Sequence, residues 1–288
     1  MVERQIMDEV RLWAGGISYA PCPPKDFCGR HEELEKLQTL IPGAGERGQV
    51  IMISGHTGIG KSSLLNRLAY DLQDRPGGPQ SLVIRAEIFE PPRMIFSAFR
   101  KLLYDLEVHA TSGWFQNIFD TESVMDAVRY TNDLLNRHVA PVEPVGLLPK
   151  TGEEIIGVFA RSPEIGYDRV RKAFVDLLQG LSRLMAGSDR IIAILLDDMH
   201  LASRPDRRLL LDIIRDLPPG VLLVFTSKSI EEGDPGYAEI RERIQNSNYS
   251  LLTLHGMKSH EIQEMGKRRF GLSLGNTTTT FLEEAAGD

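Results

Sequence analysis

The chain has 288 residues, 42% of them hydrophobic, and its 33 basic and 40 acidic residues give a formal net charge of −7. This composition is typical of a soluble α/β protein with an ample core, and the mild acidity argues against a general clamp on nucleic-acid phosphates, although a local basic patch is compatible with it. No apolar run approaches the ~20 residues of a membrane span, and residues 1–20 lack the apolar segment of a secretory signal, so we expect a cytoplasmic protein without membrane contact.

Residues 1–26 form an N-terminal arm that ends in a proline-rich stretch, and the two cysteines of the chain, Cys22 and Cys28, lie in or beside it. Two cysteines alone do not make the tight cluster of ligands that a zinc site needs. We favour reduced structural thiols, and a mutual disulfide is the alternative.

Strands and helices alternate after the arm. The spacing of leucines predicts a helix over 30–41, and the apolar run at 50–54 predicts a strand. A glycine-rich turn at 55–60 separates this strand from a predicted helix at 61–73. The chain therefore begins its folded part as helix, strand, loop and helix.

The alternation continues with a strand at 81–86 and a helix at 91–106, and then breaks at 107–166. We interpret this segment as a helical insertion. It contains Trp114, Phe115 and Phe119, which could form a partner surface but more often pack in a core.

The alternation resumes in the second half of the chain. Strands predicted at 190–198, 220–227 and 249–254 alternate with helices at 167–186, 204–218 and 259–272. Continuous apolar strands between amphipathic helices are typical of a parallel sheet covered on both faces. We therefore predict an α/β fold, a parallel five-stranded sheet sandwiched by helices, in a core domain at 27–256 that a partial helical lid at 257–288 follows.

The turn after the first strand carries the pattern G-x-x-x-x-G-K-[ST] between a strand and a helix, the setting that its chemistry needs. Glycines let the backbone wrap around phosphate oxygens, while N–H groups and the helix N-terminus point at the anion. We expect Lys61 to reach the β and γ phosphates and Ser62 to ligate Mg²⁺, whereas the His56 side chain is expected to be exposed. The predicted nucleotide-binding residues of the loop are Gly55, His56, Thr57, Gly58, Ile59, Gly60, Lys61, Ser62 and Ser63.

Two adjacent carboxylates, Asp197 and Asp198, end the most apolar predicted strand. Nucleotide-bound Mg²⁺ needs a carboxylate at the end of a strand near the phosphate loop. We therefore assign Asp197 to the metal, through a coordinated water, and Asp198 to orienting the attacking water; a solvated turn is the alternative. An extra strand between Lys61 and Asp197 is typical of additional-strand P-loop NTPases, and since no N-K-x-D motif supports GTP, we expect ATP.

Four segments, taken in order, resemble the STAND ATPases, the AAA+-related ATPases of signal transduction and regulation. They read "DFCGRHEELEKL", "VIMISGHTGIGKSSLL", "ILLDDMHLAS" and "VLLVFTSKS", and they cover about 27 to 230 apart from the insertion. The resemblance implies that Phe27, Gly29 and Arg30 lie near the adenine and ribose.

The resemblance also implies that Thr226, Ser227 and Lys228 sense the γ-phosphate, Thr226 and Lys228 as catalytic residues. Lys228 stands where the family usually has arginine, which removes the planar fork that grips phosphate. Leu201 replaces a common tryptophan and Ser203 the usual aspartate, which puts the details of that loop in doubt.

The same resemblance implies a Mg²⁺-dependent regulatory switch that binds ATP or ADP, hydrolyses ATP slowly and controls an effector or a homo-oligomer through regions outside this chain. The chain ends at Asp288, before the family's lid would be complete, so we expect a piece of a larger protein. One alternative is a DNA-associated AAA+ loader or transposition regulator, which the acidic charge disfavours. Another is a nucleotide-binding module without hydrolysis, which Asp198 in place of a glutamate keeps open.

Overall fold

The structure is a computed structural model, which describes residues 27–73, 81–88, 96–110, 121–137, 163–188, 190–228 and 248–270. Cys22 and the aromatic residues Trp114, Phe115 and Phe119 lie outside these ranges, as does the whole N-terminal arm, so the expectations for them stay predictions. Within the described ranges, no helix combines the length and the apolar character needed to cross a bilayer.

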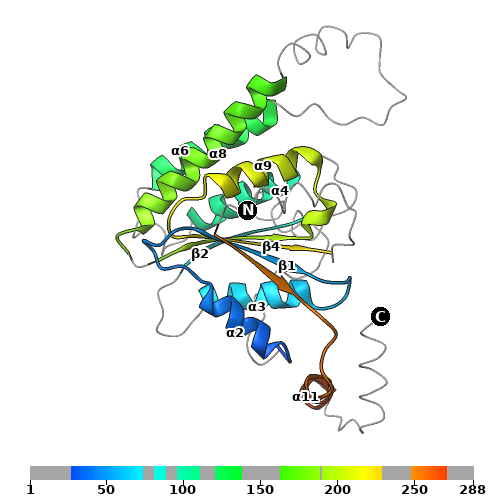
Figure 1. Ribbon diagram of the computed structural model, residues 1–288. Coiled ribbons are helices and arrows are strands. Elements are labelled where there is room, and N and C mark those ends of the chain that lie inside the picture. Colours follow the sequence, from blue (N-terminus) through cyan, green and yellow to red (C-terminus); the bar gives the residue numbers. More distant parts are fainter. Residues whose placement is uncertain are drawn as a thin grey trace, which may run out of the picture.

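A five-stranded parallel sheet forms the centre of the fold (Figure 1). Its strands are β1 (Gln49–Ser54), β2 (Leu82–Glu87), β3 (Ile192–Asp197), β4 (Val221–Ser227) and β5 (Tyr249–Thr253). Their order across the sheet is β2-β3-β4-β1-β5, so β4 lies between the strand that leads into the phosphate loop and the strand that ends in the paired aspartates. The predicted additional-strand fold is therefore confirmed.

Helices cover both faces of this sheet (Figure 1). One face carries α2 (His31–Thr39) and α3 (Lys61–Gln73), and the other carries α4 (Ser97–Ala110), α6 (Thr121–Arg137), α8 (Pro163–Met185) and α9 (Arg204–Arg215). Side chains of β1 alternate between the two layers: Val50 and Met52 belong to the cluster around α4, whereas Ile51 and Ile53 pack with α3. Because both faces are covered, both sets of strand positions have to be apolar.

The predicted insertion at 107–166 does not begin and end between elements. α4 continues through Ala110, and α8 begins at Pro163. α6 contributes Val128 and Leu135 to the same hydrophobic cluster as the sheet. The predicted boundaries therefore fall inside two helices, because the apolar spacing of each helix continues past the boundary. The division into domains stays a prediction.

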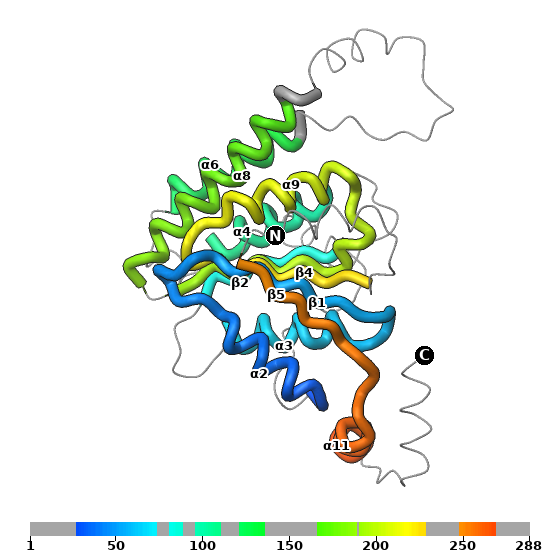
Figure 2. The backbone as a smooth tube through the Cα atoms, in the orientation of Figure 1, coloured from blue at the N-terminus to red at the C-terminus, as the bar shows by residue number. Residues whose placement is uncertain are grey.

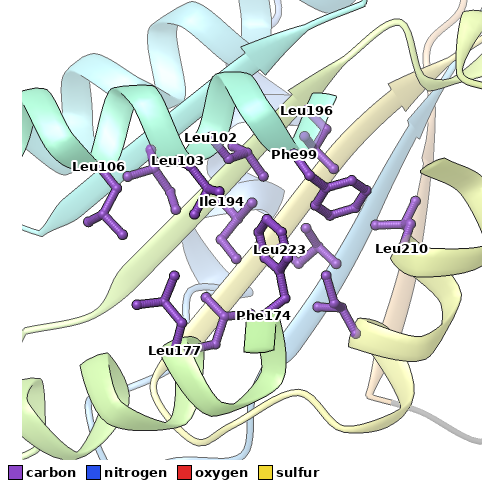
Figure 3. Close-up of a pocket in the computed structure, with 13 residues that line it drawn as sticks. Phe99, Leu102, Leu103, Leu106, Phe174, Leu177, Ile194, Leu196, Leu210 and Leu223 are labelled. Atoms are coloured by element: carbon purple, nitrogen blue, oxygen red, sulfur yellow. The ribbon is translucent and has the colours of Figure 1, made fainter. Parts of the chain in front are cut away.

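A small cavity lies inside this helical layer, between α4, α8, α9 and the sheet (Figure 3). Its lining side chains are apolar, among them Phe99 and Phe174, and its volume is about 20 Å³. A space of that size holds one water at most, and apolar walls give such a water no partners. The cavity is a packing defect rather than a binding site.

The C-terminal part of the described chain turns back toward its beginning. β5 leads into α11 (Ser259–Phe270), the helix expected to start the lid, and α11 lies beside the beginning of α2 (Figure 2). Lys258 Nζ contacts Glu32 Oε1 there at 2.8 Å. The N-terminal loop at 27–30 also contacts α11, since Arg30 N donates to Glu261 Oε1 at 2.5 Å.

Candidate functional site

The phosphate loop joins the end of β1 to the start of α3. Gly58 and Gly60 have φ angles of +83° and +99°, a backbone region that L side chains rarely adopt. At Gly55 the reason is space, because an added Cβ would lie 2.9 Å from Ile59 Cγ2 and 3.1 Å from the Leu254 carbonyl oxygen. The glycines therefore let the loop curl over the N-terminus of α3, where backbone N–H groups lack partners within the helix.

Lys61 is the first residue of α3, and its side chain folds back under the loop. Its ammonium group donates to the carbonyl oxygens of Gly55 at 3.0 Å and His56 at 2.8 Å, and the residue is 6% exposed. Burial lowers the pKa of the Lys61 ammonium group, while the charges of Asp198 and Asp197 act in the opposite direction. A cation held away from water by loop carbonyls is well suited to bind an anion that enters the loop.

A surface pocket of about 430 Å³ opens over the loop. The residues that line it are Thr57, Gly58, Gly60, Lys61, Ser62, Ser63, Asp198, His200, Leu201 and Lys228. The pocket brings together residues of the phosphate loop and residues that follow β3 and β4. Its lining does not include Phe27, Gly29, Arg30, Gly55, His56, Ile59, Asp197 or Thr226.

The paired aspartates occupy different positions, because Asp197 is the last residue of β3 and Asp198 follows it with a left-handed backbone. Asp197 ends β3, is 8% exposed and accepts a hydrogen bond from Thr226 Oγ1 at 2.5 Å. Asp198 has a φ of +58°, which turns the chain out of the strand and places its carboxylate at the pocket. Burial raises the pKa of the Asp198 carboxyl, and the negative charge of Asp197 adds to this, whereas His200 and Lys61 oppose it.

The three residues of the expected γ-phosphate sensor do not act alike in the structure. Thr226 is fully buried, and its hydroxyl accepts a hydrogen bond from Asp198 N at 2.9 Å while it donates to Asp197. Ser227 is buried as well, and its hydroxyl has no hydrogen-bond partner among the described residues. Lys228 is exposed and lines the pocket. Thr226 thus orients the aspartates, and Lys228 is the member of this trio that can reach a ligand in the pocket.

Two residues near the aspartates were missed by the sequence reasoning. Glu87 ends β2, pairs in register with Asp197, and has a carboxylate oxygen within 4.8 Å of oxygens of Asp197 and Asp198. His200 lines the pocket, with Nδ1 3.7 Å from Asp198 Oδ1. A carboxylate at the end of a second apolar strand was a signal for Glu87, but only the pairing of β2 with β3 makes it informative.

The N-terminal loop lies outside the pocket lining. Phe27 is 5% exposed and packs in the core cluster of α3, where the guanidinium carbon of Arg67 lies 5.8 Å from its ring centroid. Gly29 has a φ of +69°, and a Cβ there would lie 2.6 Å from Met257 Cε. Arg30 is buried and donates to the Ile59 carbonyl oxygen at 3.1 Å. The expected adenine and ribose contacts of this loop stay a prediction.

A comparison of the chain with models of known protein families finds a match. The profile of the AAA ATPase domain matches residues 26–225, more than half of the chain. No curated protein sequence matches the chain.

Solved structures are similar to the chain at low sequence identity. One is the signal transduction ATPase with numerous domains (STAND) with a tetratricopeptide repeat sensor from Pyrococcus horikoshii, at 15% identity and a TM-score of 0.42, covering 94% of this chain and 29% of that chain. Another is the ORC1 protein of Aeropyrum pernix in complex with DNA, at 17% identity and a TM-score of 0.46, covering 96% of this chain and 59% of that chain. The chain spans less than two thirds of both proteins.

Proposed function

The chain belongs to the AAA ATPase domain family, and from this premise we propose that it binds ATP with Mg²⁺ beside Lys61 and hydrolyses it slowly as a regulatory switch. The observation that carries the proposal is the pocket of about 430 Å³ whose walls combine Lys61 and Ser62 with Asp198. Its volume is within the usual range of ligand pockets, ≈ 300–1,000 Å³. Its chemistry pairs a buried cation for phosphate with a carboxylate for water.

Each residue of the site has a distinct role in this proposal. Lys61 binds the β and γ phosphates, and Ser62 and Asp197 hold Mg²⁺, with Glu87 adding negative charge beside Asp197. Mg²⁺, when bound, neutralises phosphate charge that the protein would otherwise have to stabilise alone. Asp198 orients the attacking water, and its raised pKa makes it a better proton acceptor than an ordinary aspartate.

The regulatory part of the proposal rests on Lys228 and on the STAND-like motifs. Lys228 is an exposed cation on the pocket wall, so it can contact the γ-phosphate of ATP, which ADP lacks. A nucleotide shifts a conformational equilibrium only as far as its affinities for the two states differ. The STAND-like motifs support an effector or a second copy as the partner that this switch controls, through regions outside the chain.

Turnover in three proteins tests the proposed chemistry. We expect slow, Mg²⁺-dependent phosphate release from the wild type. Asp198→Asn is expected to keep Mg·ATP affinity but to lose at least ~100-fold in turnover, since a positioned acid–base group contributes typically 10²–10⁴-fold. Asp197→Asn is expected instead to raise the Mg²⁺ concentration needed for half-maximal rate.

Phosphate release across a Mg²⁺ titration, with nucleotide affinity measured separately, distinguishes these effects. Identical behaviour of the two variants would show that the division of roles between Asp197 and Asp198 is wrong. ATP bound by the wild type without any Mg²⁺-dependent turnover would reduce the protein to a nucleotide-binding module.

A further inference from the structure

Arg30 joins three parts of the molecule that are distant in sequence. Its side chain is 6% exposed although it carries a charge. Nη2 donates to the carbonyl oxygen of Ile59 in the phosphate loop at 3.1 Å, and also to the carbonyl oxygen of His255, between β5 and α11. Nη1 forms an ion pair with Glu33 Oε1 at 2.9 Å. One rigid guanidinium group therefore bridges the phosphate loop and the segment that leads into α11.

The backbone of Arg30 makes a second link to the same helix. Arg30 N donates to Glu261 Oε1 at 2.5 Å, and the other oxygen of that carboxylate accepts from Lys258 N at 2.8 Å. Glu261 lies in the first turn of α11, is 7% exposed, and so holds the start of the helix against the N-terminal loop. The approach is close, because a Cβ on Gly29 would lie 3.2 Å from Glu261 Cβ.

Two other polar contacts between the α11 region and the beginning of α2 are exposed to solvent. The ion pair of Lys258 with Glu32 has side chains that are 55% and 67% exposed, and His31 Nε2 lies 3.4 Å from Glu264 Oε2 with 57% of the His31 side chain exposed. Exposed ion pairs contribute little because solvent screens them. The hydrogen bond between Arg30 N and Glu261 is therefore better shielded from solvent than these two contacts.

We propose that Arg30 is a positioning residue that couples the phosphate loop to α11, so that nucleotide in the loop changes how firmly α11 is held. This inference rests on the proposed function. Phosphate that binds in the loop displaces the backbone around Ile59. Arg30 moves with the Ile59 carbonyl oxygen to which it donates, and because the same guanidinium group donates to the His255 carbonyl oxygen, the displacement reaches the segment before α11. Arginine suits this role because its planar fork has several fixed donors, whereas lysine offers a single point charge.

Hydrogen exchange of the backbone amides at 255–262 tests the coupling, with affinity for Mg·ATP measured independently by calorimetry. In the wild type we expect ATP to change exchange in this segment at least ~10-fold. In Arg30→Ala, with ATP raised until the calorimetric titration shows that the variant is saturated, we expect the exchange response to be lost. Arg30→Lys is expected not to restore the response.

Two further variants distinguish coupling from simple docking. Glu261→Ala leaves the contact of Arg30 with Ile59 but releases α11, so it is also expected to lose the response; it serves as well if Arg30→Ala does not fold. Lys258→Ala removes the exposed ion pair with Glu32, keeps the backbone N–H that donates to Glu261, and is expected to respond like the wild type.

The possible results separate this inference from the proposed function. A full exchange response in Arg30→Ala, or its loss in Lys258→Ala, would overturn the inference alone. Failure of the wild type to bind ATP in the calorimeter would overturn the proposed function and this inference with it. Wild-type binding without any exchange response at 255–262 would overturn the coupling and leave ATP binding intact.

Discussion

Thr226 is the residue on which the arrangement of the two aspartates depends. Its hydroxyl donates to Asp197 Oδ1 at 2.5 Å and accepts from Asp198 N at 2.9 Å, in a fully buried position. Thr226→Val keeps the shape of the side chain but leaves both partners without this hydroxyl. Because an unsatisfied buried polar group costs ≈ 1–3 kcal/mol, we expect a fall of about that size in the free energy of unfolding.

Urea denaturation of Thr226→Val and of Thr226→Ser measures this effect. The serine variant keeps the hydroxyl and is expected to stay within about 1 kcal/mol of the wild type, the loss of one methyl group. A valine variant as stable as the wild type would show that the hydroxyl does not hold the aspartates.

Single residues of the site differed in how well the sequence could predict them. The phosphate loop was predictable because its glycines and Lys61 form a local sequence pattern that its backbone geometry requires. The structure shows this geometry in the positive φ angles of Gly58 and Gly60. Glu87 was not, because its place beside Asp197 depends on which strands pair. The contacts of Arg30 were also beyond reach, since they lie 29 and 225 positions away along the chain.

At the scale of elements, the start of α9 contains a buried acid with an unusual pKa. Asp206 lies in the first turn of α9, has no exposed surface, and its backbone N–H donates to Ser203 Oγ at 3.2 Å. Burial raises its pKa from 3.8 to about 6, although hydrogen bonds to Ser203 and to the backbone at Ala98 and Phe96 oppose the shift. Between about pH 3.8 and pH 6, Asp206 therefore holds a proton in the folded state but has released it in the unfolded state.

This pKa predicts a pH dependence of stability with a definite sign. The contribution of Asp206 to stability is greatest below pH 3.8 and declines as the pH rises to about 6, above which it stays constant. At about 1.4 kcal/mol per pKa unit the decline is on the order of 3 kcal/mol. In Asp206→Asn the side chain is neutral at every pH, so we expect the variant to lack this decline in stability.

Chemical denaturation of both proteins at pH 4, 5, 6 and 7 measures the difference in their free energies of unfolding, which cancels the titration of other groups. We expect this difference to move in favour of the asparagine variant between about pH 4 and pH 6, and to level off above. A difference that is the same at every pH would mean that Asp206 keeps an ordinary pKa.

The kinds and order of the elements could be predicted because apolar spacing differs between buried strands and amphipathic helices. β1, β3 and β4 are continuous apolar runs, and α3 and α9 show helical spacing with their caps or glycines at the ends. The helix predicted to end at residue 106 continues through Ala110, because α4 keeps its apolar face to that point. Spacing alone does not separate an inserted helix from a helix of the core.

At the scale of the whole molecule, the site lies where an open parallel sheet usually binds ligands. The phosphate loop, the aspartates and Lys228 all follow the carboxyl ends of strands, at β1, β3 and β4. The strand order brings these groups together, because β4 lies between β3 and β1 and the carboxyl ends of the three strands are therefore neighbours. The position of α11 could not be foreseen in the same way, because it depends on the contact of Arg30 with Glu261, 231 positions apart.

The central claim is that ATP binds through Lys61, and calorimetric titration of ATP with Mg²⁺ into the wild type, Lys61→Ala and Lys228→Ala tests it most directly. Lys228→Ala is the matched control, because it removes an exposed lysine from the same pocket. Loss of a hydrogen bond from a charged group costs ≈ 1.5–3 kcal/mol, so we expect Lys61→Ala to weaken binding by roughly 10- to 100-fold or more and Lys228→Ala to weaken it less. Equal affinity of Lys61→Ala and the wild type for ATP would contradict the account.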